Sequence, residues 1–316
     1  MNYRKLGNAG IKLSEIGLGS WLTYGRGVDD DVSKDCMQRA FDLGINFFDT
    51  ADIYAKGAAE TVCGRILKDF RRQDLVIATK LFFPMTDNPN DCGLSRKHLF
   101  ESVHNSLHRL QTDYIDLYQC HRFDEQVELF ETVRAMDDLI RQGKILYWGV
   151  SEWPALEIKN ACRVAREINA CPPVSNQPEY SIAARGVETN GVQTACSQDG
   201  LGMVVWSPLK QGILSGKYSG GQIPKNSRAA SDTMNVFLKE IDRDLADRVD
   251  RLRPLAERRK ITLAQLALAW LLQRPAVTSV IVGASSVRQV EENAAASALE
   301  LATEDMAAID ELFPAE

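Results

Sequence analysis

Four residues with titratable side chains stand at, or just beyond, the ends of short apolar stretches in the sequence. Asp49 ends the stretch that begins at Ile45, and Tyr54 follows five residues later. Lys80 ends the stretch "LVIATK", and His121 ends "IDLYQCH". Any one of these residues alone would be interpreted as a cap, a turn or a solvated side chain. Four of them at successive strand ends instead indicate a site for proton transfer.

Reduction of a carbonyl group is a reaction that this set of side chains would serve, because it adds a hydride to carbon and a proton to oxygen. Tyr54 can donate the proton, but the ordinary tyrosine pKa of about 10 is high for transfer near neutral pH. The ammonium of Lys80 would stabilise the tyrosinate and lower that pKa. Asp49 would hold Lys80 in place, and neutral His121 would orient the carbonyl oxygen.

These four residues can meet only if the fold brings strand ends together. Eight apolar, β-branched stretches alternate with helical patterns, as is typical of parallel strands covered on both faces. They cover residues 15–21, 45–51, 75–80, 115–121, 145–151, 174–180, 202–209 and 279–285. We therefore predict a (β/α)8 TIM barrel that forms a single domain over residues 1–316, with all eight carboxyl ends at one rim. A doubly wound open sheet is the alternative, although no GxGxxG fingerprint follows an early strand.

Helical patterns cover residues 32–44, 95–111, 130–143, 153–168 and 261–273. Gly44 is a predicted C-cap, Ser95 a predicted N-cap, and Pro154 is placed in a first turn. Two segments depart from the βα rhythm. Residues 3–13 contain "GNAG" and predict an N-terminal hairpin that would plug the barrel. Residues 210–244 form a long loop after strand 7, on the face where barrel active sites lie.

Composition and charge narrow the classes of partner. The 316 residues are 45% hydrophobic and carry a formal net charge of −6, which argues against nucleic acid or an anionic membrane as main partner. We expect no secretory signal and no membrane segment, since the longest apolar run is about half a bilayer span. Seven cysteines without a CxxC pair predict reduced thiols, and hence a cytoplasmic protein. Three of the four histidines share one helix without further ligands, so no metal site is expected.

A series of motifs gives the sequence a specific resemblance. In order they are "GLGSW", "INFFDTADIY", "IATK", "DLYQCH", "YWGVSEW", "NQPEY", "WSPLKQGILSGKY" and "GASSVRQVEEN". With these motifs the chain resembles the aldo-keto reductase superfamily over nearly its whole length. The segments "AETVCGRILKD" and "GLSRKHLFESV" are most similar to the β subunits of voltage-gated potassium channels and their bacterial and plant relatives. The resemblance implies a catalytic tetrad of Asp49, Tyr54, Lys80 and His121. Channel β subunits usually have Asn where this chain has His121, which favours a working reductase.

The resemblance also implies a bound NADP(H) without a Rossmann motif. Ser151 and Gln177 would hold the nicotinamide carboxamide, and Trp206 would stack on the nicotinamide ring. The pyrophosphate would be surrounded by Ser207, Leu209, Gly212, Lys217 and Arg228. Lys217 and Arg228 belong to the long loop of residues 210–244, which would act as a lid over the cofactor. The adenosine end would contact Ser285, Gln289, Glu292 and Asn293. The implied cofactor contacts are completed by Ser20, Trp21, Asp49, Glu152, Pro208 and Gly283.

Two positions depart from the pattern of the superfamily. Many members have Arg where Gln289 stands, and that Arg grips the 2′-phosphate of NADP(H). The channel-subunit branch also has Gln there and is still associated with NADP(H), so NADP(H) remains the expected cofactor. Glu152 stands where Asn is common, which adds a charge near the cofactor.

The expected substrate is a small carbonyl compound. The candidate pocket wall consists of Trp21, Tyr24, Phe82, Phe83, Arg122 and Trp153. This aromatic-rich set predicts a preference for apolar or aryl aldehydes. The alternative function is that of an NADP(H)-binding, redox-sensing regulatory subunit of an ion channel or another partner. The likeness to channel subunits would then imply a homotetramer, although many superfamily members are monomers.

Overall fold

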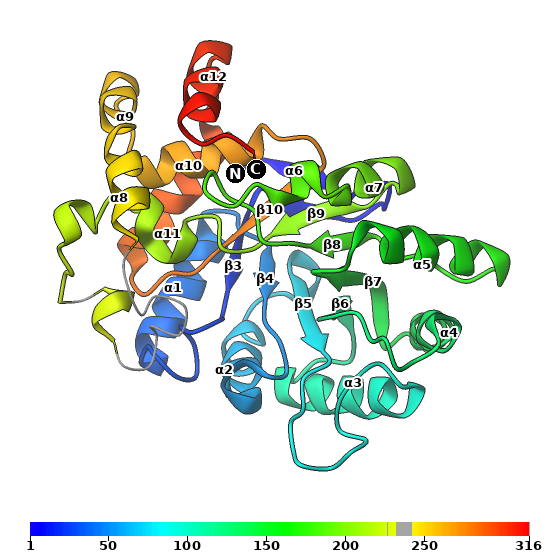
Figure 1. Ribbon diagram of the computed structural model, residues 1–316. Coiled ribbons are helices and arrows are strands. Elements are labelled where there is room, and N and C mark those ends of the chain that lie inside the picture. Colours follow the sequence, from blue (N-terminus) through cyan, green and yellow to red (C-terminus); the bar gives the residue numbers. More distant parts are fainter. Residues whose placement is uncertain (226, 232–241, 316) are drawn as a thin grey trace.

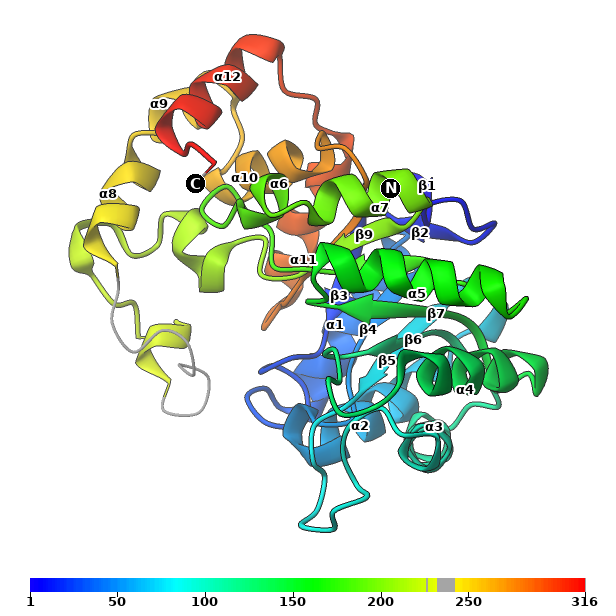
Figure 2. The same cartoon turned by 45° about the vertical axis from the view of Figure 1, so that its right-hand side comes forward.

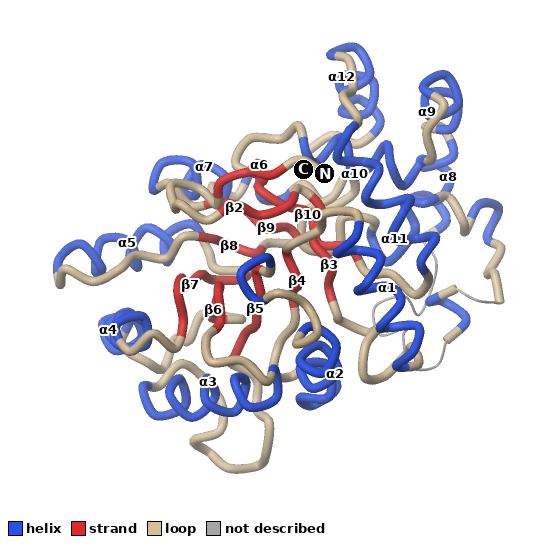
Figure 3. The backbone as a smooth tube through the Cα atoms, turned by 180° about the vertical axis from the view of Figure 1, so that it is seen from behind, coloured by secondary structure: helices blue, strands red, loops and turns tan. Residues whose placement is uncertain are grey.

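A computed structural model describes residues 1–225, 227–231 and 242–315 of the chain. Eight parallel strands close into a barrel, and helices surround it (Figure 1). The strands follow one another around the barrel in chain order, from β3 to β10, and β10 closes the ring by pairing with β3. Seen from behind, the strands occupy the middle of the molecule and the helices lie outside them (Figure 3). The predicted TIM barrel is confirmed, and the alternative prediction of an open, doubly wound sheet is wrong.

The strands are β1 (Tyr3–Lys5), β2 (Lys12–Ser14), β3 (Ile16–Gly19), β4 (Phe47–Asp49), β5 (Val76–Leu81), β6 (Ile115–Cys120), β7 (Ile145–Ser151), β8 (Ser175–Gln177), β9 (Gly202–Val205) and β10 (Val277–Val282). The helices that accompany the first strands are α1 (Asp30–Asp42), α2 (Ala58–Leu67), α3 (Arg96–Leu110), α4 (Leu129–Arg141), α5 (Ala155–Glu167), α6 (Gly186–Thr189) and α7 (Val192–Asp199). The remaining helices are α8 (Arg243–Asp250), α9 (Arg253–Arg259), α10 (Leu263–Leu272), α11 (Val287–Ala294) and α12 (Thr303–Leu312). Figure 2 shows α8, α9 and α12 gathered on the side of α10, away from β5, β6 and β7.

Several strands end earlier than the apolar stretches predicted. The predicted seventh strand extended to residue 209, but β9 ends at Val205. Ser207 adopts a φ of 56°, in the left-handed region, and this turns the chain out of the barrel. Residues 206–209 therefore belong to the rim. Ser95 caps α3 as predicted, since its side chain accepts a hydrogen bond from the His98 N–H, whereas Pro154 precedes α5 instead of lying in its first turn.

The predicted N-terminal hairpin closes one end of the barrel. Strands β1 and β2 pair antiparallel, with Tyr3 opposite Ser14. Arg4 donates a hydrogen bond to the carbonyl oxygen of Val277, where β10 begins. Leu6, at the turn of the hairpin, is fully buried among side chains of the barrel interior. The hairpin thus fills the amino-terminal end and leaves the opposite rim for the site.

The barrel interior changes from apolar to polar along its axis. Phe47, Val76 and Ala78 point inward and belong to one buried cluster. A Cβ atom on Gly17 would lie 2.5 Å from the Phe47 ring, so glycine leaves the space that this ring fills. Because side chains alternate along a strand, the next inward positions after Phe47 and Ala78 are Asp49 and Lys80. The two charged residues therefore lie above an apolar floor.

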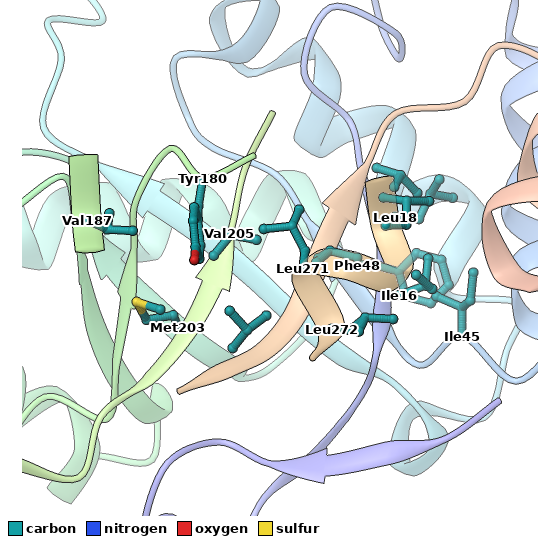
Figure 4. Close-up of a cluster of buried hydrophobic side chains, with 14 of the residues drawn as sticks. Ile16, Leu18, Ile45, Phe48, Tyr180, Val187, Met203, Val205, Leu271 and Leu272 are labelled. Atoms are coloured by element: carbon teal, nitrogen blue, oxygen red, sulfur yellow. The ribbon is translucent and has the colours of Figure 1, made fainter. Parts of the chain in front are cut away.

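The outer faces of the strands pack against the helices. Figure 4 shows Ile16, Leu18 and Phe48 in this outer layer, with Leu271 and Leu272 of α10 nearby. All but one of the residues of α10 are buried, as expected for its strongly apolar sequence. Among the residues that the structure describes, none of the helices is both long and apolar enough to cross a bilayer.

Candidate active site

A buried ion pair forms the base of the site. Lys80 Nζ lies 2.6 Å from Asp49 Oδ2, and the side chains are 0% and 4% exposed. Lys80 also donates a hydrogen bond of 2.7 Å to the Thr50 carbonyl oxygen. The other oxygen of Asp49 accepts hydrogen bonds from the amides of Gln177, at 2.9 Å, and Gln119, at 3.4 Å. Donors from three further strands thus satisfy the charge of Asp49 and fix its position.

A strained turn places Tyr54 above this pair. A short, kinked 3₁₀ segment over Tyr54–Gly57 follows β4. Ala55 and Lys56 have φ values of 49° and 51°, an unfavourable conformation for residues other than glycine. Local strain of this kind is found preferentially at functional sites. The hydroxyl of Tyr54 lies 3.4 Å from Lys80 Nζ, within hydrogen-bond distance.

His121 completes the group of four titratable residues. It follows β6 and is 7% exposed, and its ring centroid lies 5.8 Å from that of Tyr54 in an edge-to-face arrangement. The structure therefore brings Asp49, Tyr54, Lys80 and His121 together at the carboxyl ends of β4, β5 and β6, which are neighbours in the barrel.

Burial and charge act in opposite directions on Tyr54 and Lys80. Burial raises the pKa of Tyr54, the ammonium of Lys80 lowers it, and the net result is a pKa above the ordinary value of 10. The predicted lowering effect of Lys80 is present, but the expectation of a lowered pKa is wrong because burial outweighs it. Burial would lower the pKa of Lys80, yet Asp49 and Tyr54 outweigh it and raise that pKa above 10.5. At neutral pH Tyr54 is protonated and Lys80 is charged.

The imidazole of His121 is neutral in this environment. Burial lowers its pKa well below 6.5, and the positive charges of Lys80 and Arg122 lower it further. Its Nδ1 atom is buried and has no hydrogen-bond partner among the described residues. Since an N–H group at that position would be a buried donor without an acceptor, we place the single proton on Nε2. His121 can then donate a hydrogen bond from Nε2.

A cavity of about 670 Å³ opens above the four residues. Most of the residues predicted for the site line it. They are Trp21, Tyr24, Asp49, Tyr54, Phe83, His121, Arg122, Ser151, Gln177, Trp206, Ser207, Pro208, Leu209, Gly212, Lys217, Arg228, Gly283, Ser285, Gln289, Glu292 and Asn293. Part of the predicted lid, residues 226 and 232–241, lies outside the described residues.

Two residues predicted to form the pocket wall do not line the cavity. Trp153 is 1% exposed and packs edge-to-face on Phe123, with the ring centroids 4.9 Å apart. Phe82 packs against Phe83, at 5.4 Å, and Phe83 is the ring of this pair that lines the cavity. Phe82 therefore packs against a ring of the wall without joining the wall, and Trp153 belongs to the buried core.

Two residues predicted to contact the cofactor are also outside the lining. Ser20 is buried and donates a hydrogen bond to the Thr50 hydroxyl. Glu152 accepts a hydrogen bond of 2.6 Å from the indole Nε1 of Trp206 and another from the Glu179 N–H. Glu152 thus holds the Trp206 ring in place, which accounts for a carboxylate at this position.

The sequence interpretation missed several polar residues of the site, among them Gln119 and Arg26; Thr23, Gln211 and Ser215 also line the cavity. Gln119 hydrogen-bonds Asp49, and the strand period could have indicated it, because it stands two residues before His121. Arg26 lines the cavity from the turn after β3, and the sequence gives no signal for it.

The part of the cavity lined by Lys217 and Arg228 suits an anionic group. Neither side chain forms an ion pair with any described residue. Desolvation lowers the pKa of both side chains, and the charge of Arg228 lowers that of Lys217 further. A Cβ atom on Gly212 would lie 2.6 Å from Lys217 Nζ, so the backbone approaches this cation closely. Two cations that have no ion-pair partner among the described residues, beside a glycine-containing loop, fit the pyrophosphate of a nicotinamide dinucleotide.

A TIM barrel with a buried Asp–Lys pair, a tyrosine and a neutral histidine at its carboxyl rim defines a class of carbonyl oxidoreductases. Residues 15–313 match the family model described as "Aldo/keto reductase family", and the chain belongs to this family. It is accordingly an NAD(P)-dependent oxidoreductase that acts on carbonyl compounds. Among residues 1–225, 227–231 and 242–315, no three or more His, Cys, Asp and Glu side chains form a group that could hold a metal ion.

Three relatives are similar to the chain over most of its length. A "Probable voltage-gated potassium channel subunit beta" of Oryza sativa subsp. japonica is 42% identical, over 93% of this chain and 90% of the relative. The protein of the same description from Arabidopsis thaliana is 41% identical over the same shares. A "Putative voltage-gated potassium channel subunit beta" of Schizosaccharomyces pombe is 42% identical, over 98% of this chain and 93% of the relative.

Proposed function

We propose that the protein is an NADPH-dependent reductase of aldehydes and ketones, with Tyr54 as the general acid. One observation carries the proposal: the Tyr54 hydroxyl lies 3.4 Å from a charged, buried Lys80, and Tyr54 lines the same cavity as a neutral His121. When bound, the reduced nicotinamide supplies the hydride. The residues of the chain bind and orient the substrate and supply the proton.

The proton comes from the hydroxyl of Tyr54. It passes to the carbonyl oxygen and leaves a tyrosinate, whose negative charge the Lys80 ammonium stabilises. Asp49 keeps Lys80 charged and in position. His121 donates a hydrogen bond from Nε2 to the same carbonyl oxygen and aligns it toward Tyr54. Tyr54 regains its proton from solvent after the alcohol leaves.

Among the residues proposed to hold the nicotinamide, the hydrogen bonds already made within the protein determine which groups can bind the cofactor. The amide nitrogen of Gln177 already donates to Asp49, so the Gln177 side-chain oxygen remains to accept from a carboxamide NH₂. The Ser151 hydroxyl lies beside it and donates to the Gln177 carbonyl oxygen. Trp206 has its indole nitrogen engaged by Glu152, so its ring face is held ready for stacking.

The direct test is the oxidation of NADPH, followed at 340 nm, with 4-nitrobenzaldehyde and methylglyoxal as carbonyl substrates and NADH in parallel. Turnover with NADPH that exceeds turnover with NADH supports the proposal. The absence of turnover with both cofactors, despite measurable NADPH binding, would contradict it.

The rate of reduction is expected to show no titration near pH 6.5. Reduction requires protonated Tyr54, whose pKa lies above 10, and neutral His121, whose pKa lies well below 6.5. The rate therefore falls only below the pKa of His121 or above that of Tyr54, and kcat stays constant between these limits. Initial rates at saturating NADPH across pH 6.5 to pH 9 would check this. A decline in kcat as the pH falls from 8 to 6.5 would show that His121 titrates and acts in another protonation state.

The two unpaired cations are expected to contribute to cofactor affinity. We expect Lys217→Ala and Arg228→Ala each to weaken NADPH binding ~10-fold or more, because each removes a charge-assisted hydrogen bond. The affinity for NADH would fall by the same factor, since the pyrophosphate is common to both cofactors. Fluorescence titration measures the affinities, and Lys225→Ala is a matched control from the same loop, outside the lining. Unchanged affinity in both cation variants would place the pyrophosphate elsewhere.

The names of the relatives favour a second candidate function, that of an NADP(H)-binding regulatory subunit of a channel or another membrane protein. This function predicts tight cofactor binding, negligible turnover, and co-purification with a membrane partner from native membranes. It also predicts a homotetramer, which sedimentation would detect. His121 weighs against it, because the resembling channel subunits usually have Asn there.

A further inference from the structure

Arg122 is held at the substrate end of the cavity. It follows His121 in the chain, is partly exposed, and lines the cavity. Its guanidinium lies over the ring of Phe83, 5.5 Å from the ring centroid, and donates a hydrogen bond of 2.5 Å to the His121 carbonyl oxygen. The Phe83 ring in turn contacts the His121 imidazole edge-to-face at 5.0 Å. One phenyl ring therefore separates the guanidinium from the imidazole that would orient the carbonyl.

The charge of Arg122 has no counterion in the part of the chain that the structure describes. Other partly buried arginines are paired; for example, Arg72 lies 2.6 Å from Asp116, and Arg109 lies 2.6 Å from Glu60. The hydrogen bond to the His121 carbonyl uses one of the five N–H donors of Arg122, so the guanidinium keeps donors for a ligand.

The surrounding lining adds positive charge. Arg26 also lines the cavity and forms no ion pair with a described residue. The carboxylates of the lining are Asp49, which is paired with Lys80, and Glu292, which belongs to α11. Among the described residues, the cavity lining thus holds cations without an ion-pair partner, in a protein whose formal net charge is −6. Such a local field attracts an anion against the charge of the whole protein.

We propose that the pocket selects carbonyl compounds that also carry a carboxylate, and that Arg122 binds this carboxylate. The inference rests on the proposed reductase function and names its substrate class. A guanidinium forms two parallel hydrogen bonds to a carboxylate, which gives orientation as well as affinity. The aromatic residues Trp21 and Phe83 suit an aryl spacer between the two ends of the substrate. The predicted preference for aryl aldehydes is thereby narrowed to those with an acidic group.

The test compares 4-carboxybenzaldehyde with its methyl ester, methyl 4-formylbenzoate, using NADPH. The ester has the same ring and the same aldehyde but no charge, and its aldehyde is intrinsically the more electrophilic. We expect kcat/KM for the acid to exceed that for the ester by about 10-fold or more, the value of one good charged contact. The ratio should fall as sodium chloride is added, because salt screens partly exposed charges.

Substitutions assign the preference to a residue. Arg122→Gln should bring the acid-to-ester ratio to about one or below, mainly by raising KM for the acid, and Arg122→Lys should give an intermediate ratio. Arg251→Gln removes the same charge from an exposed site outside the cavity and should leave the ratio unchanged. Because a ratio of two substrates is measured, a general loss of activity in a variant cancels.

Three results would overturn the inference. A wild-type ratio at or below one would show that the pocket does not select carboxylates, even if the ester is turned over and the reductase function stands. An acid-to-ester ratio that survives Arg122→Gln would show that Arg122 does not bind the carboxylate. Loss of that ratio in Arg26→Gln would assign the selectivity to Arg26 instead. Turnover of neither aldehyde, with NADPH bound, would overturn the reductase function and the inference with it.

Discussion

Replacing Tyr54 with phenylalanine is expected to lower kcat for carbonyl reduction by about 10²–10⁴-fold, the range typical of a lost general acid. The substitution removes the hydroxyl that lies 3.4 Å from Lys80 Nζ and leaves the ring in contact with Trp21 and His121. NADPH affinity should remain unchanged, because the residues proposed to hold the cofactor are untouched. Single-turnover rates at 340 nm and a fluorescence titration of NADPH measure the two quantities separately.

Tyr118→Phe is the matched control for this experiment. This substitution also removes one tyrosine hydroxyl. Tyr118 is a fully buried residue of β6 that belongs to the outer core and does not line the cavity. We expect this variant to keep wild-type turnover. If Tyr54→Phe also kept more than half of the wild-type kcat, Tyr54 could not be the acid, and His121 would be the next candidate donor.

The sequence predicted the parts of the site that depend on strand topology. Asp49, Lys80 and His121 were placed together because parallel strands in a barrel end at one rim, and the structure has them there. The same reasoning, extended by the two-residue strand period, would have found Gln119. Ser95 caps α3 as predicted, because its signal is local; the C-cap of α1 is Leu43, and the predicted Gly44 is the next residue, in the left-handed conformation.

The parts that were not predicted depend on tertiary packing. Ser207 has a left-handed backbone that no local rule assigns to serine, so the end of β9 could not be read from its apolar sequence. Trp153 packs against Phe123, which is distant in sequence, so the sequence could not show that Trp153 lies outside the pocket wall. The net pKa of Tyr54 required knowledge of its burial, which competes with the charge of Lys80. Helices such as α8 and α9 were missed because their strong polarity weakens the apolar signal.

The Asp49–Lys80 pair is expected to serve catalysis and to add little net stability, which single and double substitutions would separate. Asp49→Asn leaves the Lys80 ammonium, which is 0% exposed, without its counterion. Removing one partner of a buried pair costs about 3–5 kcal/mol in the free energy of unfolding. The variant should also lose most of its turnover, because Lys80 is then neither fixed nor kept charged beside Tyr54.

The pH dependence of the Asp49→Asn variant identifies the cause of its instability. Without Asp49, burial dominates and the pKa of Lys80 in the folded state falls below its ordinary value of 10.5. Folding then releases a proton, so the stability of the variant relative to wild type rises with pH up to that value. Urea unfolding at pH 6.5 and pH 9 would measure this. A destabilisation that is the same at both pH values would mean that the loss comes from the hydrogen bonds of Gln119 and Gln177 instead.

Combining Asp49→Asn with Lys80→Met separates the two roles of the pair. The double variant buries no unpaired charge, so most of the lost free energy of unfolding should return, since a well-packed apolar residue can replace a buried ion pair at little cost. Turnover should remain as low as in Tyr54→Phe, because the tyrosinate formed on proton transfer has lost the ammonium that stabilises it. Recovery of stability without activity would mean that this ion pair is maintained for proton transfer and not for folding. Recovery of both would place the stabilising charge elsewhere, and Arg122 would be the next candidate because its charge also lowers the pKa of Tyr54.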